Sequence, residues 1–300
     1  TQAYLVPLGI GAVLKTTWAT FRAQPKQFIV IGGTTSALLV LLSVLSVVPL
    51  LENVQTAIFA MDFESLIMSL PLLVGGIAVV CSLVEIVGSV MISGVADGVG
   101  RGVRRGYPEL LQRGLRAVPK AIIWVLLASA ASALLTAVFG AWLKTVVEST
   151  IDSDIRAATT SLLLGTLAML FGSLVLSVAV YLFTVRLFLL CPIYYLEEAS
   201  GLAALKRAWS LSKGASPRIL LTLLIVSFAV GLASQVCTFP IMLVGVNSYS
   251  SVTELLLQNL GMVIFVLLAI FVLDAISRMA LSIASVVFYH DQIRLGKPAQ

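Results

Sequence analysis

One stretch of the sequence decides the fold: residues 201–239, GLAALKRAWSLSKGASPRILLTLLIVSFAVGLASQVCTF. Its first half places Leu202, Leu205 and Trp209 on one helical face beside basic residues, which predicts an amphipathic helix on a membrane surface. Pro217 then precedes an apolar run long enough to cross a bilayer, which takes about 20 residues. This order describes a chain that turns from the membrane surface into the membrane.

The same order occurs three times in the chain. It is centred on Pro25-Lys26, Pro119-Lys120 and Pro217-Arg218, so the prolines are 94 and 98 residues apart. Apolar residues at helical spacing precede the other two junctions as well: Ile10, Leu14, Trp18 and Phe21 before the first, and Leu111, Leu115 and Val118 before the second. We expect each proline to break an interfacial helix, because it lacks the N–H that a helix interior needs.

We interpret this pattern as three tandem repeats, each an interfacial helix followed by a helical hairpin. The repeat units cover about residues 9–100, 108–201 and 202–296. The simpler alternative is that basic residues and prolines mark helix entries in any multi-span protein. The coincidence of proline, basic residue and preceding amphipathic helix at all three junctions favours the repeat.

The composition predicts an all-α, polytopic membrane protein. Hydrophobic residues make up 59% of the chain and charged residues 11%, against about 45–50% and about 25% in soluble domains. We expect one transmembrane domain over residues 1–300 with six transmembrane helices. The six apolar runs are 28–51, 65–84, 121–143, 157–185, 219–253 and 255–273, and the second, fourth and sixth continue past embedded charges.

The basic residues predict the orientation. Lys and Arg gather before the first run, in the even-numbered loops and after the last run, whereas the outer loops hold acids such as Glu52, Asp152 and Glu254. Since Lys and Arg favour the cytoplasmic side, we expect both termini in the cytoplasm of a bacterial or archaeal plasma membrane. Anionic lipid headgroups explain the net charge of +5, so nucleic acid is not an expected partner.

The interfacial helices are the expected contact surface for membrane lipids with anionic headgroups or for a partner, either a membrane protein complex or a second copy of the chain. The residues assigned to this surface are Trp18, Arg22, Lys26, Arg113, Arg116, Lys120, Lys206, Arg207, Trp209, Lys213 and Arg218.

Four charges lie inside the predicted spans, where ionisable residues are costly and are candidates for function. They are Glu85, Arg186, Asp274 and Arg278, each on the closing helix of a repeat and at similar depth. The structural interpretation is a net-neutral ion-pair network that fixes helix packing, and it is favoured because buried charges are usually paired. The functional alternative is a proton or ion relay, or a site for a zwitterionic headgroup.

Small residues predict close helix contacts at two places. Gly94 and Gly98 have the Gly-x-x-x-Gly spacing, and Ser129 and Ala133 repeat it with small side chains. Such spacing lets helix backbones approach closely in lipid, so packing is the expected role.

Two motifs carry a family resemblance. Their residues are Gly201, Leu205, Lys206, Arg207, Trp209, Lys213 and Gly214 in the first, and Tyr289, Asp291 and Arg294 in the second. This pattern resembles the membrane domain found beside some glycerophosphoryl diester phosphodiesterases, although Ala208 and Gln292 differ from the residues common there. The resemblance implies a six-span, stand-alone membrane domain. It does not imply phosphodiesterase activity, since this chain has one histidine and no matching cluster of carboxylates.

No catalytic, metal-binding or cofactor-binding residue is predicted. His290 is the only histidine, and one imidazole cannot build the usual zinc site. It stands beside Asp291, but no nucleophile is identifiable near it. Asp97 and Asp274 lack the flanking residues of an intramembrane aspartyl protease.

The leading hypothesis is a non-enzymatic integral membrane protein that acts as a scaffold, an accessory subunit or a lipid-organising protein. The alternative is a transporter or lipid-handling channel that uses the embedded charges. A water-accessible cavity at those charges favours transport, and a dry, fully paired network favours the scaffold.

Overall fold

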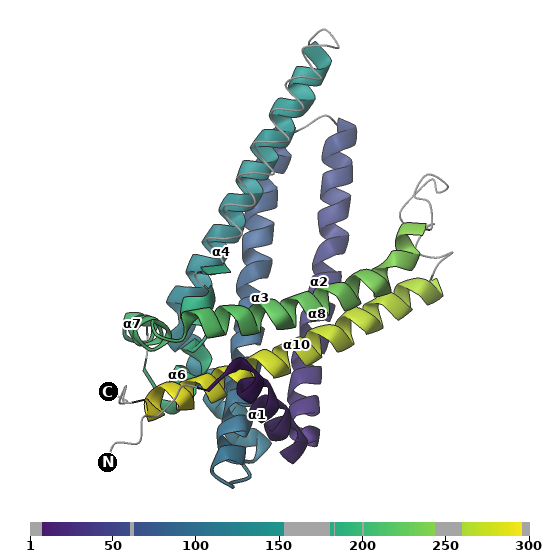
Figure 1. Ribbon diagram of the computed structural model, residues 1–300. Helices are drawn as coiled ribbons and strands as arrows, with labels where there is room; N and C mark the ends of the chain where they lie inside the picture. Colours follow the sequence, from purple (N-terminus) through teal and green to yellow (C-terminus); the bar gives the residue numbers. More distant parts are fainter. Residues whose placement is uncertain are drawn as a thin grey trace. The chain divides into compact units, whose positions relative to one another are not determined.

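The computed structural model describes residues 8–60, 63–152, 181–182, 184–199, 201–243 and 260–295. All regular elements within these ranges are helices, as the sequence predicts (Figure 1). They are α1 (Ile10–Ala23), α2 (Pro25–Ala60), α3 (Phe63–Gly100), α4 (Tyr107–Asp152), α6 (Leu190–Leu196), α7 (Gly201–Ser212), α8 (Ser216–Leu243) and α10 (Leu260–Arg294).

Five helices in the described part of the chain are long and apolar enough to cross a membrane. Their apolar segments are Pro25–Ser46, Leu73–Gly100, Tyr107–Val138, Ser216–Phe239 and Leu260–Arg294. They match five of the six predicted runs. The remaining run, 157–185, lies mostly outside the described residues, and a shorter apolar helix, Thr184–Leu196, follows it.

The chain forms two compact units. The first combines Thr1–Val40, Val84–Lys120 and Val185–Gln300, and the second combines Leu41–Leu83 and Ala121–Thr184. Helices α2, α3 and α4 each contribute to both units.

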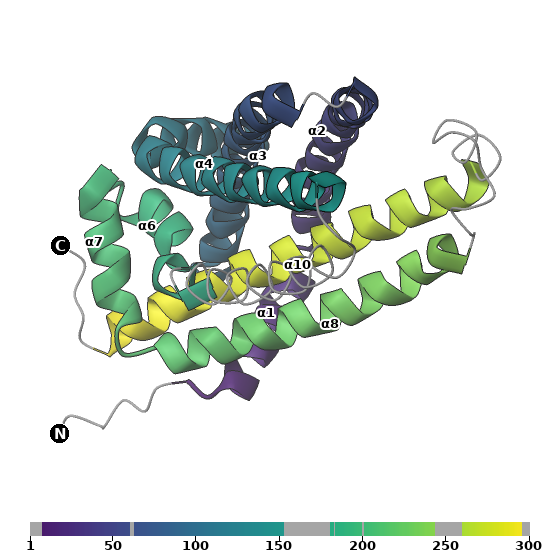
Figure 2. The ribbon, with the colours of Figure 1, turned by 90° about the horizontal axis from the view of Figure 1, so that it is seen from above.

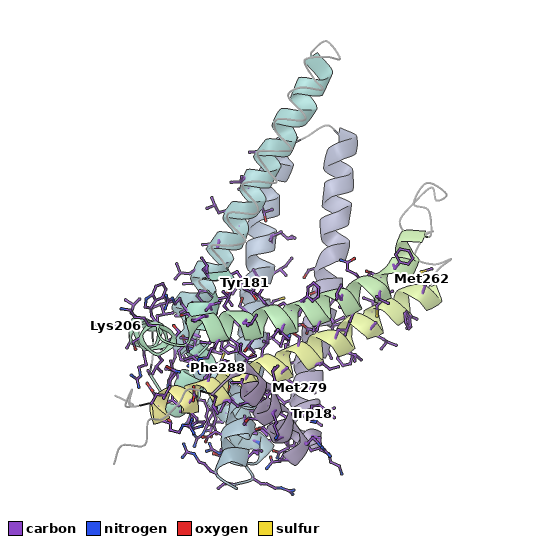
Figure 3. The ribbon with its side chains drawn as sticks, viewed as in Figure 1. Trp18, Tyr181, Lys206, Met262, Met279 and Phe288 are labelled. Atoms are coloured by element: carbon purple, nitrogen blue, oxygen red, sulfur yellow. The ribbon has the colours of Figure 1, made fainter. Side chains whose placement is uncertain are left out.

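In the first unit, α8 and α10 lie side by side, and α1 packs against both (Figures 1 and 2). The short helix α6 contacts α7 and α10. Phe288 of α10 is fully buried here, whereas Trp18 of α1 is exposed (Figure 3). Gly32 of α2 makes room for Met279, whose Cγ lies 2.6 Å from where a Cβ of residue 32 would stand.

The helix ends explain two of the three proline junctions. Gln24 adopts a non-helical conformation between α1 and α2, as expected for a residue before proline. Residues 213–215 form a turn before α8, and Pro217 is the second residue of that helix. Proline is tolerated in a first turn because the N–H there has no partner in the helix.

The prediction that Pro119 ends a helix is wrong. Helix α4 continues through it, so the second amphipathic helix and the following apolar run form one element. The difference lies in the residues before each proline. Those before Pro119 stay helical, whereas Gln24 and the turn of residues 213–215 end the preceding helix before Pro25 and Pro217. A proline within a helix removes one backbone hydrogen bond without always ending the helix.

The turn that follows α3 requires a glycine. Gly102 has φ of +70°, and the Val103 N–H donates to the Gly98 carbonyl at 2.8 Å while the Gly102 N–H donates to Val99 at 3.2 Å. This pair of bonds is the Schellman motif, which satisfies the last carbonyls of a helix.

The predicted small-residue contacts are confirmed for Ser129 with Ala133 and for Gly94, whereas a Cβ at Gly98 would stand 2.7 Å from the Val103 carbonyl in the turn after α3. In the second unit, a Cβ at Gly75 of α3 would stand 3.4 Å from the Cβ of Ala133 and 3.8 Å from the Ser129 carbonyl of α4. In the first unit, a Cβ at Gly94 would stand 2.6 Å from Leu110 Cδ2. Small side chains therefore set the helix approach, as expected in lipid.

Candidate functional site

Three buried carboxylates lie where α3, α6 and α10 end, all in the first unit. Asp97 is near the end of α3, Glu197 directly follows α6, and Asp291 is near the end of α10. Their side chains are 0%, 4% and 0% exposed. We call these three residues and their arginine partners the three-carboxylate cluster.

Asp97 is held by two arginines. Arg101 Nε lies 3.0 Å from Oδ1, and Arg105 Nη2 lies 2.9 Å from Oδ2. Arg105 also donates to the Tyr195 hydroxyl and lies over the Tyr195 ring. His290 Nε2 approaches Asp97 Oδ1 at 3.3 Å. A buried carboxylate is stable only when paired and hydrogen-bonded, and these contacts meet that need.

Glu197 has one arginine and one phenol. Arg207 Nε donates to both carboxylate oxygens at 3.1 Å, and the Tyr289 hydroxyl donates to Oε1 at 2.9 Å. Arg207 is itself mostly buried, with 12% of its side chain exposed. This contact ties the end of α6 to α7 and α10.

Asp291 joins the two ends of the described chain. Arg218 Nη1 lies 2.9 Å from Oδ2, and the Leu8 N–H donates to Oδ1 at 3.2 Å. Arg218 also donates to the Leu8 carbonyl at 2.9 Å. Arg294, one turn along α10, adds a contact of 3.4 Å to Oδ1.

Helix α10 connects all three carboxylates through three consecutive residues. Tyr289 contacts Glu197, His290 contacts Asp97, and Asp291 is the third carboxylate itself. Consecutive residues in an α-helix point about 100° apart. The cluster therefore surrounds the end of α10 and locks α1, α3, α6, α7 and α8 to it.

Sequence reasoning missed this cluster, although a signal was present. Each carboxylate stands three to five residues before the glycine that ends its predicted repeat unit: Asp97 before Gly100, Glu197 before Gly201 and Asp291 before Gly296. The three acids lie in or beside the basic segments of the predicted cytoplasmic side. Arginines are expected there for topology alone, so the sequence did not single out these acid–arginine pairs.

The cluster borders a cavity of about 470 Å³ between α1, α3 and α10. Thr16 and Thr20 of α1 line it together with Arg101, His290 and Arg294. Both buried aspartates of the neighbouring helices, Asp97 and Asp291, also reach its wall. None of the predicted embedded charges lines this cavity.

Three of the four embedded charges lie together. Arg278 Nη1 is 2.9 Å from Glu85 Oε1, and Arg278 Nε is 2.7 Å from Asp274 Oδ2. The Ser36 hydroxyl of α2 donates to the same Asp274 oxygen at 2.7 Å. The group therefore joins α2, α3 and α10 within the first unit.

The structure does not bring Arg186 into this group. Its guanidinium lies over the Trp209 ring, 5.2 Å from the centroid, and within the described residues it forms no ion pair with Glu85 or Asp274. Distance from the end of a helix predicts depth, but it does not fix which face of the helix a residue occupies. The remaining group has two carboxylates and one guanidinium, so the expected charge balance is wrong.

The predicted contact residues divide into two sets. Trp18 and Trp209 are 60% and 47% exposed, and Arg22, Lys26, Arg116, Lys206 and Lys213 are also exposed. Others have partners in the protein: Arg207 and Arg218 belong to the three-carboxylate cluster, Arg113 pairs with Glu109 at 3.3 Å, and Lys120 donates to the Glu198 carbonyl at 2.9 Å.

Small buried residues alternate with large exposed ones on the amphipathic helices. Thr17 of α1 and Ala208 of α7 are buried, and the tryptophan that follows each of them is exposed. At the start of α4, Gly114 is buried and Leu115 is 55% exposed. Each segment thus turns one large apolar residue away from the protein at the same register, although Val13 of α1, Leu110 of α4 and Leu211 of α7 are fully buried.

Comparisons with known proteins give no relative. No family model matches the chain, and no curated protein or solved structure matches it either. The resemblance to the phosphodiesterase-associated membrane domain stays an expectation from its motif residues. Of those residues, Arg207, Tyr289, Asp291 and Arg294 take part in the three-carboxylate cluster.

Proposed function

We propose that this chain is a non-enzymatic, six-span protein of a bacterial or archaeal plasma membrane, with both termini in the cytoplasm, that acts as a scaffold, accessory subunit or lipid-organising protein. The observation that carries the proposal is the shared register of α1, the start of α4 and α7. Each has a small buried residue followed directly by a large, exposed apolar one, which suits helices that lie at a lipid surface.

The three-carboxylate cluster supports the same proposal. Its contacts tie the ends of α3, α6 and α10 to α7, to α8 and to the residue before α1, which would hold α1 and α7 in fixed positions beside the spans. Arginines next to buried carboxylates serve structure here, while Arg22, Lys26 and Lys206 stay exposed for anionic headgroups or an acidic partner.

The test removes the exposed apolar residues of two surface helices. Trp18→Ala with Leu202→Ala removes side chains that are 60% and 71% exposed. The matched control is Phe228→Ala with Val236→Ala on α8, where the side chains are 69% and 73% exposed. Each protein is purified from native membranes in mild detergent, and the co-purifying proteins and lipids are measured by mass spectrometry.

We expect the surface-helix variant to lose a stoichiometric protein partner or anionic lipid that the control variant keeps. Loss of a protein identifies an accessory subunit, and loss of lipid alone identifies a lipid-organising protein. Equal retention by both variants contradicts the proposal.

Transport through the embedded charges is the second candidate. It is favoured by the surplus acid, because Glu85 and Asp274 share one arginine and the Glu85 side chain is 54% exposed. A carboxyl in a membrane span that carries a proton reacts with dicyclohexylcarbodiimide. Labelling that Glu85→Gln abolishes, together with proton flux in proteoliposomes, supports transport, and absence of both excludes this candidate.

A further inference from the structure

We propose that a second cavity, where α1 meets α2, binds the headgroup of an anionic phospholipid. Its volume is about 650 Å³. Lys26 and Val30 of α2, Arg104 of the loop between α3 and α4, and Tyr107 at the start of α4 belong to its wall. This site rests on the proposed function, since it requires a chain that spans a membrane, and it adds the class of lipid and the place where that lipid binds.

The charge of the cavity wall favours an anion. Among the described residues that line the cavity, Lys26 and Arg104 are cations and none is a carboxylate. Both cations are exposed, and neither has an ion-pair partner within the described part of the chain. Glu109, the acid nearest to Arg104 along the chain, does not line the cavity, and its carboxylate lies 3.3 Å from Arg113 and 4.0 Å from Arg105. The two positive charges of the wall are therefore available to a ligand.

The backbones that carry the two cations are tied together. The Gln27 side-chain Nε2, next to Lys26, donates to the Arg105 carbonyl, next to Arg104, at 3.1 Å. The Arg105 side chain is anchored in turn, with Nη2 at 2.9 Å from the fully buried carboxylate of Asp97. Because the start of α2 and the loop are joined in the ligand-free protein, little backbone ordering has to accompany binding between the two cations.

The cavity lies where two helices that can cross a membrane begin. The apolar segments Pro25–Ser46 and Tyr107–Val138 both start with residues of its wall. Val30, four residues after Lys26 and so about one helical turn further along α2, also lines the cavity and is 48% exposed. Tyrosine at the start of a span is typical of the headgroup level. The wall thus passes from charged to apolar along α2, in the order of a phospholipid headgroup and its acyl chain.

These features favour phosphatidylglycerol over two other ligands. Phosphatidylethanolamine also carries a phosphate, but its ammonium group would lie beside two cations with no carboxylate in the wall to bind it. Inorganic phosphate has no acyl chain to contact Val30. A cavity of about 650 Å³ is within the usual range for small ligands, about 300–1,000 Å³, and so has room for one headgroup.

The test uses the full chain in mild detergent and three probes: phosphatidylglycerol, phosphatidylethanolamine and inorganic phosphate. Native mass spectrometry measures the binding of each lipid and the displacement of phosphatidylglycerol by phosphate. We expect phosphatidylglycerol to bind at least about tenfold more tightly than phosphatidylethanolamine, because two cations near the surface attract its net charge. Equal binding of the two lipids, or displacement by inorganic phosphate at a similar concentration, overturns the proposal.

Variants of the wall cations locate the site. Lys26→Gln should weaken phosphatidylglycerol binding about fivefold, and Lys26→Gln with Arg104→Gln at least about tenfold. The matched control is Lys15→Gln, which removes an exposed lysine of α1 that does not line the cavity, and it should stay within about twofold of the wild type. Thermal unfolding checks that the double variant folds. Unchanged binding in a folded double variant overturns the proposal.

A further variant separates this cavity from the surface helices of the proposed function. Lys206→Gln with Lys213→Gln removes two exposed cations from α7 and the turn that follows it. If it weakens phosphatidylglycerol binding as much as the double cavity variant does, charge spread over the whole surface explains the binding. The cavity proposal then fails while the proposed function stands. Weakening that is confined to the cavity variants supports the site.

Discussion

The backbone of Leu8 and the carboxylate of Asp291 are joined by a hydrogen bond of 3.2 Å, although 283 residues separate them. Arg218 bonds to both partners, so the start of α1, the start of α8 and the end of α10 meet at one fully buried carboxylate. This relationship makes Asp291 the residue whose loss most directly tests the three-carboxylate cluster.

Replacing Asp291 with Ala should lower the free energy of unfolding by about 2–4 kcal/mol, because it leaves a mostly buried arginine beside no carboxylate. Thermal unfolding in detergent measures the effect. Glu109→Gln is the control: its half-exposed carboxylate lies 3.3 Å from Arg113 and, at 4.0 Å, only at the edge of contact with Arg105 of the cluster, and such pairs contribute less than about 1 kcal/mol. Equal effects of the two substitutions would show that the cluster adds no stability.

The acids around Arg278 should be interchangeable in part. Glu85→Leu leaves Asp274 within 3 Å of Arg278 and should destabilise by about 1 kcal/mol or less. Asp274→Leu also removes the acceptor of the buried Ser36 hydroxyl and should cost about 1–3 kcal/mol. The double variant leaves the Arg278 guanidinium with neither carboxylate. Its loss in the free energy of unfolding should exceed the sum of the two single losses by about 1–3 kcal/mol. Additive effects in a double-mutant cycle would count against a shared arginine.

Gly94 should not tolerate a side chain. A Cβ there would stand 2.6 Å from both Leu110 Cδ2 and Tyr195 Cε2, so Gly94→Ala should destabilise by about 1–3 kcal/mol through overpacking. Gly231→Ala, in the interior of α8 and with open space around it, should be neutral or stabilising by up to about 1 kcal/mol. Unfolding midpoints of the two variants that do not differ would refute the close contact.

Pro119 should weaken the helix that contains it. Pro119→Ala restores a backbone donor within α4 and should raise stability by about 1–3 kcal/mol. Pro25→Ala is the control, since Pro25 begins α2, where proline costs little. A fall in stability for Pro119→Ala would mean that the proline supports a bend the packing requires.

The sequence predicts the helices well because the apolar runs are long and nearly free of charge. Five of the six runs coincide with described helices, and Asp274 and Arg278 pair as their four-residue spacing requires. The same reasoning places Glu85 at the right depth to join them. The length of an apolar run and the spacing of two residues within one helix can be read directly from the sequence. Neither requires knowledge of how one helix is rotated against another.

What the sequence could not predict depends on rotation about the axis and on local turns. Arg186 has the depth of Glu85 but contacts Trp209, because its helix turns that face toward α7. Pro119 looks like Pro25 and Pro217, yet only the latter two follow residues that leave the helix. The three carboxylates were hidden because each lies among arginines that topology already explains.

The position of α10 in the three-carboxylate cluster has a consequence for synthesis of the protein. Tyr289, His290 and Asp291 supply contacts to Glu197, Asp97 and Leu8, and these three residues are made after all their partners. Until α10 leaves the ribosome and inserts, Asp97, Glu197 and Leu8 each lack one contact. The cluster can therefore close only when α1, α3, α6, α7 and α8 are in place and α10 has joined them.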